Sequence, residues 1–178
     1  KTIATAPESV RSLSWATLAT GEQRLFFNSF PADAPAFVAS IALAGAEQQH
    51  LAEAESFEVV ADQLYLADPF ERGRLWAVNA ADGSNARVLV ESDVQAFAAR
   101  PGGSGQVAVL QLTGELQYDL SLLNVSGQAT RPLTSGSLAI SPLWSPDGKT
   151  LYYAVFDLEA SDEVDDPFMV MKIDLSQS

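Results

Sequence analysis

Cysteine is absent from the chain. This absence excludes disulfide bonds, thiolate metal sites and cysteine nucleophiles. It is compatible with oxidising and reducing compartments alike, because a chain of 178 residues with 47% hydrophobic content buries a core that needs no cross-links. We therefore expect one globular domain that spans residues 1–178.

Positive charge is scarce. The chain has 10 lysines and arginines against 23 aspartates and glutamates, which gives a formal net charge of −13. Nucleic acids and anionic membrane surfaces bind clusters of lysine and arginine, so neither is an expected partner. An acidic surface is instead suited to a protein or peptide with a basic surface, or to metal cations.

Long hydrophobic runs are also lacking. The longest, Ala34–Ala46, is well short of the roughly 20 residues of a membrane-spanning helix, so no membrane insertion is expected. No signal peptide is visible. Because the chain opens with Lys1 rather than methionine, we expect that a leader, a tag or a larger protein preceded it.

What the chain does contain is an internal repeat. A glycine followed six residues later by leucine occurs three times, at Gly45–Leu51, Gly83–Leu89 and Gly127–Leu133. A second set of apolar residues recurs at intervals of 39, 43 and 44 residues, at Leu25, Leu64, Val107 and Leu151. A period near 40 residues, carried by short β-branched and aromatic segments, is typical of a propeller with one blade per repeat.

The pattern therefore predicts an all-β protein, a β-propeller built from four antiparallel blades. The approximate repeats are 12–53, 54–92, 93–135 and 136–178. Apolar residues run almost continuously within the expected strands, which suits sheets that are covered on both faces.

Two local segments refine this prediction. Ala36–Ala54 is rich in alanine and compatible with a helix on propensity alone. Gly45 interrupts it, however, and shares the repeat spacing, so two strands are favoured. Asp82-Gly83 predicts a tight hairpin, because glycine supplies the positive φ that such turns need.

The two ends of the chain resemble two parts of one hairpin. Lys172–Ser178 is similar to Leu122–Gln128, and Lys1–Thr5 is similar to Arg131–Ser135. We expect Lys1–Thr5 to complete the last blade by pairing beside Met169–Leu175, because this closure leaves fewer unpaired strand edges.

The segment Trp144–Lys149 reads Trp-Ser-Pro-Asp-Gly-Lys. It resembles the repeat of TolB-like and related WD-like β-propellers. Proline presets φ, aspartate binds the turn backbone and glycine adopts the left-handed conformation, so Pro146, Asp147 and Gly148 are expected to form a structural turn. The resemblance implies a binding role and an extracytoplasmic location, periplasmic or secreted. Members of this family usually have six or more blades, so the chain is a whole small propeller, part of a larger one, or half of a homodimer.

Six carboxylates crowd into residues 157–166. Oxygen-rich loops suit calcium, and the candidate metal ligands are Asp157, Asp162, Asp165 and Asp166. The spacing lacks the glycine and the terminal glutamate of an EF-hand loop. A solvated acidic loop that binds no ion tightly is therefore the expected outcome, and no cofactor is predicted.

Residues for catalysis are few. His50 is the only histidine, so a Ser-His-Asp triad would have to use it. Ser104 lies in a glycine-rich run that predicts a flexible loop instead of a strained nucleophile turn. We predict no catalytic residue and interpret His50 as an ordinary strand residue.

Large aromatic side chains recur near the expected strands. Trp15 aligns with Trp144, and Trp76 and Phe97 lie in other repeats. Exposed, these rings would be platforms for sugars or peptides; buried, they would fill the space between blades. Core packing is the expected role for all four.

The sequence thus favours a non-catalytic protein- or ligand-binding propeller. One alternative is a propeller fragment of a larger enzyme such as a prolyl-oligopeptidase-like peptidase, which a downstream hydrolase domain would support. Another is a stand-alone hydrolase or lyase, which would need two convergent acids in a central pocket.

Overall fold

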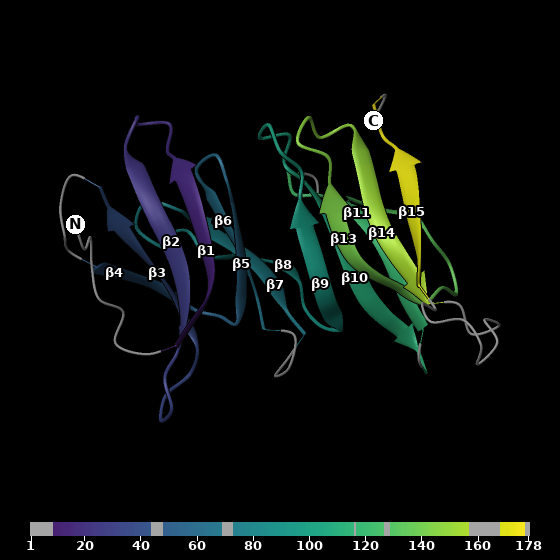
Figure 1. Ribbon diagram of the computed structural model, residues 1–178, viewed down its shortest axis with the longest axis horizontal. Helices are drawn as coiled ribbons and strands as arrows, with labels where there is room; N and C mark the ends of the chain where they lie inside the picture. Colours follow the sequence, from purple (N-terminus) through teal and green to yellow (C-terminus); the bar gives the residue numbers. More distant parts are fainter. Residues whose placement is uncertain are drawn as a thin grey trace. The chain divides into compact units, whose positions relative to one another are not determined.

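The computed structural model describes residues 9–43, 48–68, 73–115, 117–126, 129–156 and 168–176. Every regular element in these ranges is a β-strand (Figure 1). In the same ranges no helix is long and apolar enough to cross a membrane. The chain divides into two compact units, Lys1–Ser92 and Asp93–Ser178.

The first unit contains two four-stranded antiparallel sheets. Sheet I has the order β1-β2-β3-β4 and sheet II the order β5-β6-β7-β8. The strands of sheet I are β1 (Ser9–Thr17), β2 (Gln23–Phe30), β3 (Phe37–Ala42) and β4 (Gln48–Glu53). Those of sheet II are β5 (Ser56–Val60), β6 (Gln63–Ala67), β7 (Leu75–Asn79) and β8 (Arg87–Val90).

The second unit repeats this arrangement. Sheet III has four strands in the order β12-β11-β10-β9, and sheet IV has three described strands in the order β13-β14-β15. Sheet III comprises β9 (Val94–Ala99), β10 (Gln106–Gly114), β11 (Gln117–Asn124) and β12 (Ala129–Pro132). Sheet IV comprises β13 (Ala139–Trp144), β14 (Thr150–Phe156) and β15 (Phe168–Asp174).

The predicted fold class is confirmed, because the sheets are antiparallel and resemble propeller blades. The strand interpretation of Ala36–Ala54 is also confirmed, since β3 and β4 occupy this segment. The single-domain interpretation and the repeat limits stay predictions. The expected pairing of Lys1–Thr5 involves residues that lie outside the described ranges.

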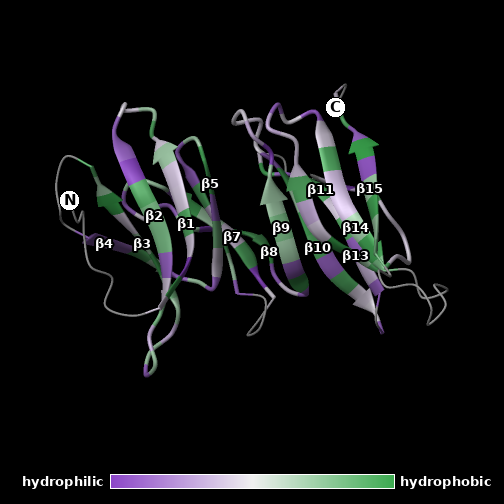
Figure 2. Ribbon diagram, viewed as in Figure 1, coloured by the Kyte–Doolittle hydropathy of each residue, from purple (hydrophilic) through white to green (hydrophobic). Residues whose placement is uncertain are grey.

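In the first unit, the core is formed where one face of sheet I packs on one face of sheet II. Phe26 and Val38 come from sheet I, and Leu64, Leu66 and Trp76 come from sheet II. Neighbouring residues of a strand point to opposite faces, and each such side chain contributes roughly 1.5–3 kcal/mol when it is fully buried. The hydrophobic bands along these strands are visible in Figure 2.

The second unit is held in the same way. Leu110 and Leu120 of sheet III pack with Leu151 of sheet IV, and all three are buried. Trp144 joins this cluster, and its indole nitrogen donates a 2.9 Å hydrogen bond to the carbonyl of Ala98. The buried side chains of this sheet-on-sheet contact are apolar, and the indole nitrogen of Trp144 has a hydrogen-bond partner.

The core role predicted for the four aromatic residues is wrong for Trp15. Trp76, Trp144 and Phe97 are buried, but 48% of Trp15 is exposed. The reason is its face: Trp15 pairs with Leu25 on the side of sheet I that does not pack on sheet II. The adjacent Ala16, whose side chain points to the other side, packs against the core.

The Asp82-Gly83 hairpin joins β7 to β8. Gly83 has a φ of +74°, and its amide donates to the Asn79 carbonyl at 2.8 Å. A Cβ atom at this position would lie 2.5 Å from the carbonyl oxygen of Leu51 in sheet I. Glycine is thus required here twice, for the backbone conformation and for the close approach of the two sheets.

We predict that Gly83→Ala lowers the free energy of unfolding by roughly 3 kcal/mol, from the strained φ and the clash together. Gly21→Ala is the matched control, because Gly21 has a φ of +82° with nothing within 4 Å of the added Cβ. The control should cost only about 1 kcal/mol. Denaturant unfolding monitored by circular dichroism measures both, and equal losses would contradict the proposed close approach.

Candidate functional site

A hollow of about 150 Å³ opens in the first unit. It is formed by three connections: the segment before β3, the link between β4 and β5, and the ends of β6 and β7. Its lining residues are Pro35, Ala36, Glu53, Ala54, Glu55, Asp68 and Arg74. No sequence motif pointed to any of them.

Backbone hydrogen bonds fix the wall of this hollow. The amide of Ala54 donates to the Ala36 carbonyl at 3.0 Å, and the amide of Glu55 donates to the Ala67 carbonyl at 3.1 Å. The buried side chain of Asn28 adds a third bond, from its Nδ2 to the Glu55 carbonyl at 2.8 Å. The β4–β5 link is therefore tied to both sheets of the unit.

Asp68 and Arg74 form the charged pair of the hollow. Asp68 is buried, and its Oδ1 accepts a 2.8 Å hydrogen bond from the Arg74 amide. Its Oδ2 lies 3.5 Å from Nη2 of Arg74. The guanidinium also stacks over Trp76, with its carbon 4.4 Å from the ring centroid. These contacts hold the arginine against the wall.

The hollow therefore carries three carboxylates and one guanidinium, a net negative charge. Its volume is about ten times what a single water molecule requires, which is ample for an ammonium or guanidinium group. The described residues contain no group of three or more His, Asp or Glu side chains placed to hold a metal ion. Chemically, the arrangement suits the binding of a cation-bearing group.

His50 and Ser104, the residues considered above for catalysis, do not line this hollow. His50 is exposed on β4, and its ring lies 4.9 Å from that of Phe37. Ser104 is an exposed residue of the connection between β9 and β10. The candidate calcium ligands Asp157, Asp162, Asp165 and Asp166 lie outside the described residues.

The turn of the Trp-Ser-Pro-Asp-Gly-Lys motif joins β13 to β14. Oδ1 of Asp147 accepts hydrogen bonds from Oγ of Ser145 at 2.6 Å and from the amide of Lys149 at 3.1 Å. The amide of Gly148 donates to the Ser145 carbonyl at 2.8 Å, with a φ of +67° at the glycine. Pro146 precedes these two residues. The turn's polar groups are thus used within the turn.

Arg100 anchors this turn to sheet III, a contact that the sequence did not reveal. Its Nε donates to the Gly148 carbonyl at 2.6 Å, and its Nη2 donates to the Leu175 carbonyl at 3.1 Å. The guanidinium also lies over the Trp144 ring, 5.1 Å from its centroid. The Gly148 carbonyl and the Trp144 ring of the motif thus take part in the contact between sheets III and IV.

Hydrogen bonds lower the pKa values of three turn aspartates. The pKa of Asp147 is lowered below its ordinary value, first by the hydroxyl of Ser145 and then by the Lys149 amide. The pKa of Asp82 is lowered by the side chain and amide of Ser84, and that of Asp174 by the amide and side chain of Ser176. Each donor stabilises the ionised carboxylate.

We predict that Ser145→Ala raises the pKa of Asp147 toward the ordinary 3.8, because the largest stabilising contact is lost. A lowered folded-state pKa adds stability that is complete above the unfolded-state value and is lost as the pH falls through the folded-state value. Carboxyl titration by NMR measures the shift. Asp174 is the internal control and should titrate unchanged; an unaltered Asp147 would contradict the assignment.

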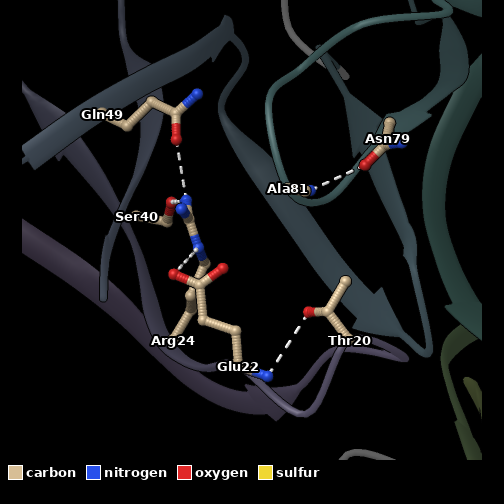
Figure 3. A network of polar contacts seen from close by, with 7 residues as sticks. All are labelled: Thr20, Glu22, Arg24, Ser40, Gln49, Asn79 and Ala81. Carbon is tan, nitrogen blue, oxygen red and sulfur yellow. Dashed lines mark hydrogen bonds and ion pairs between the residues drawn. The ribbon is translucent and has the colours of Figure 1, made fainter. Parts of the chain in front are cut away.

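A second polar network lies within the first unit and makes its contacts there. Nη1 of Arg24 donates to Oγ of Ser40 at 2.8 Å and to Oε1 of Gln49 at 2.7 Å (Figure 3). Its Nε lies 3.2 Å from Oε1 of Glu22. These contacts connect three strands of sheet I, so the network stabilises the sheet and is a poor ligand site.

Comparison with known proteins identifies the fold. Neither a family model nor a curated protein sequence matches this chain. Among solved structures, it is similar to a prolyl endopeptidase, with a TM-score of 0.67 and 13% identity over 93% of this chain and 25% of that one.

The chain is also similar to a putative TolB from Agrobacterium tumefaciens, with a TM-score of 0.65 and 13% identity over 86% of this chain and 58% of that one. An oligogalacturonate lyase from Vibrio parahaemolyticus gives a TM-score of 0.65 and 12% identity over 98% and 54%. The fold is that of part of a β-propeller. The chain spans between a quarter and three fifths of these structures.

Proposed function

We propose that this chain is a non-catalytic binding module that recognises a protein or peptide with a basic surface. The observation that carries the proposal is the acidic hollow of the first unit, with Glu53, Glu55 and Asp68 facing a space of about 150 Å³. A lysine or arginine side chain of the partner is the group that fits this charge and size. Loops at strand ends form the hollow, where specificity usually resides.

Charge supports the same partner. The formal net charge of −13 attracts a basic protein over distances of about the Debye length, roughly 10 Å at 0.1 M salt. Such attraction mainly raises the association rate, whereas the local contacts of the hollow determine the register of the bound partner.

The proposed location is extracytoplasmic. It is supported by the structural similarity to TolB and by the Trp144–Lys149 motif. Fractionation of cells that express the full-length gene, followed by immunodetection of the protein, tests this location directly. Recovery in the cytoplasmic fraction would contradict it.

We predict that a short lysine-rich peptide binds the chain and that its affinity falls as salt rises. Replacing Glu53 and Glu55 together by glutamine removes two charges from the hollow and should weaken binding roughly fivefold or more, from about 0.5–1 kcal/mol per charge pair. Calorimetry or fluorescence anisotropy at two salt concentrations measures the effect.

The control for this experiment is the double variant Glu91→Gln with Glu115→Gln. Both residues are exposed and neither lines the hollow, so this variant loses the same net charge elsewhere. Equal weakening in both double variants would show that the peptide responds only to overall charge. That result would overturn the assignment of the hollow.

Absence of catalysis is part of the proposal. We predict no turnover with a panel of esterase, peptidase and glycosidase substrates. General acid–base catalysis needs an acid and a base of suitable pKa within reach of the same reacting bond. Turnover that disappears in the Glu53→Gln and Glu55→Gln variant would refute the binding interpretation and favour a stand-alone hydrolase or lyase.

A second candidate function is a propeller part of a larger peptidase. The similarity to a prolyl endopeptidase and to puromycin hydrolase supports it, with TM-scores of 0.67 and 0.66. The chain covers 25% and 27% of those structures. The neighbouring sequence separates the two candidates, because a hydrolase domain encoded beside this segment would favour the peptidase.

A further inference from the structure

Sheet IV has an exposed apolar face. Leu143 pairs with Tyr152, Phe156 pairs with Phe168, and Val170 pairs with Ala154, so alternation along the strands places these side chains on one side. Leu143 is 65% exposed and Val170 is 77% exposed. We call this surface the outer face of sheet IV; its large exposed members are Leu143, Tyr152, Phe156, Phe168 and Val170.

A patch of this kind is unusual on a monomer. Exposed apolar residues that stand alone need no explanation, but a contiguous group on one sheet marks an interaction surface. The opposite face of the same sheet carries Trp144 and Leu151, which pack on sheet III. Sheet III therefore covers this face at Trp144 and Leu151, whereas Met169 and Met171 of β15, on the same face, remain 48% and 42% exposed.

The side of sheet I that faces away from sheet II is open only in part. Leu13 is 66% exposed and Trp15 is 48% exposed, and both point away from the core shared with sheet II. Phe27 and Ile41 lie on the same side but are already buried. The open part, which we call the outer face of sheet I, is therefore concentrated on β1.

Register shows what kind of surface would cover β1. Trp15 pairs with Leu25 in sheet I as Trp144 pairs with Leu151 in sheet IV. In sheet IV, the pair Trp144–Leu151, which we call its tryptophan row, packs on sheet III and is buried. The row of sheet I has the same arrangement, so a propeller-type sheet packed against it would bury Trp15.

The outer face of sheet IV has the corresponding arrangement. Its pair Leu143–Tyr152 matches the pair Ala98–Ala108 of sheet III. Those two alanines belong to the face of sheet III that covers the tryptophan row of sheet IV. In register, the open face of sheet IV thus corresponds to the face of sheet III that covers a tryptophan row, although Leu143 and Tyr152 are larger than the two alanines.

We infer that the outer face of sheet IV packs on the outer face of sheet I of a second copy of this chain. Each copy then supplies the surface that the other lacks. The similar TolB and oligogalacturonate lyase structures are matched over 58% and 54% of their length, so two copies provide about as much chain as one such propeller. The contact joins two different patches and is heterologous.

Charge on the two faces permits this contact. The charged residues at paired positions of the outer face of sheet IV are Lys172 and Asp174, which are opposite in sign. Arg11 lies near Leu13 on β1 with its guanidinium over the Phe30 ring.

The net charge of −13 per chain opposes association from a distance. Salt screens that repulsion, so the dimer should persist or strengthen at a salt concentration that weakens peptide binding.

Light scattering of the whole chain tests the inference. The expected mass is about twice the 19.0 kDa of one chain. Val170→Asp and Leu13→Asp should each weaken association at least about tenfold, because each places a carboxylate in an apolar contact. Both side chains are exposed, so neither change should alter the circular dichroism spectrum. A wild-type monomer would overturn the inference and leave a further sheet of a longer polypeptide as the occupant.

Mixing the two variants identifies the paired faces. The Val170→Asp chain keeps its sheet I face, and the Leu13→Asp chain keeps its sheet IV face, so an equimolar mixture should regain dimers that neither variant forms alone. Leu112→Asp is the control and should stay dimeric, since Leu112 lies on β10 of sheet III and belongs to neither face. Dimers of Leu13→Asp alone would instead indicate that two sheet IV faces meet, and would overturn the proposed pairing.

Discussion

The structure depends on the burial of apolar sheet faces against one another. A blade-like sheet has apolar side chains on both faces, so each face needs a cover. Phe26 and Leu64 meet this need between sheets I and II, and Leu120 and Leu151 meet it between sheets III and IV. Tight turns, close glycines and the Arg100 anchor follow from this constraint, because they allow two sheets to approach without leaving polar groups unsatisfied.

Much of this fold was predictable from the sequence because the repeat reports the strand pattern directly. Gly83 marks a hairpin, and Leu25 and Leu151 mark equivalent strands. Burial was less predictable. Trp15 and Trp144 have the same register but opposite exposure, since burial depends on the presence of a neighbouring sheet. Local sequence carries no information about that neighbour.

The candidate site was not predictable from the sequence, for a topological reason. Glu53 is the last residue of β4 and Glu55 lies in the link to β5, whereas Asp68 and Arg74 flank the connection between β6 and β7. These residues share no motif, and ordinary loop composition explains each one separately. Only the pairing of β5 with β6 and β6 with β7 brings them to one end of sheet II. The acidic run at 157–166 is easier to notice in the sequence than these residues, but only because six carboxylates are close together there.

The hollow is also connected to the core that positions it. Asn28 is buried in sheet I, where its Oδ1 accepts from the Ser12 amide at 2.8 Å and its Nδ2 donates to the Glu55 carbonyl at 2.8 Å. One side chain thus links β1, β2 and the β4–β5 connection. A wall held in this way has little conformational freedom to lose, so the binding proposed for the hollow would retain more of the electrostatic attraction as affinity. The packing of the sheets therefore determines the shape of the hollow on which the proposed binding depends.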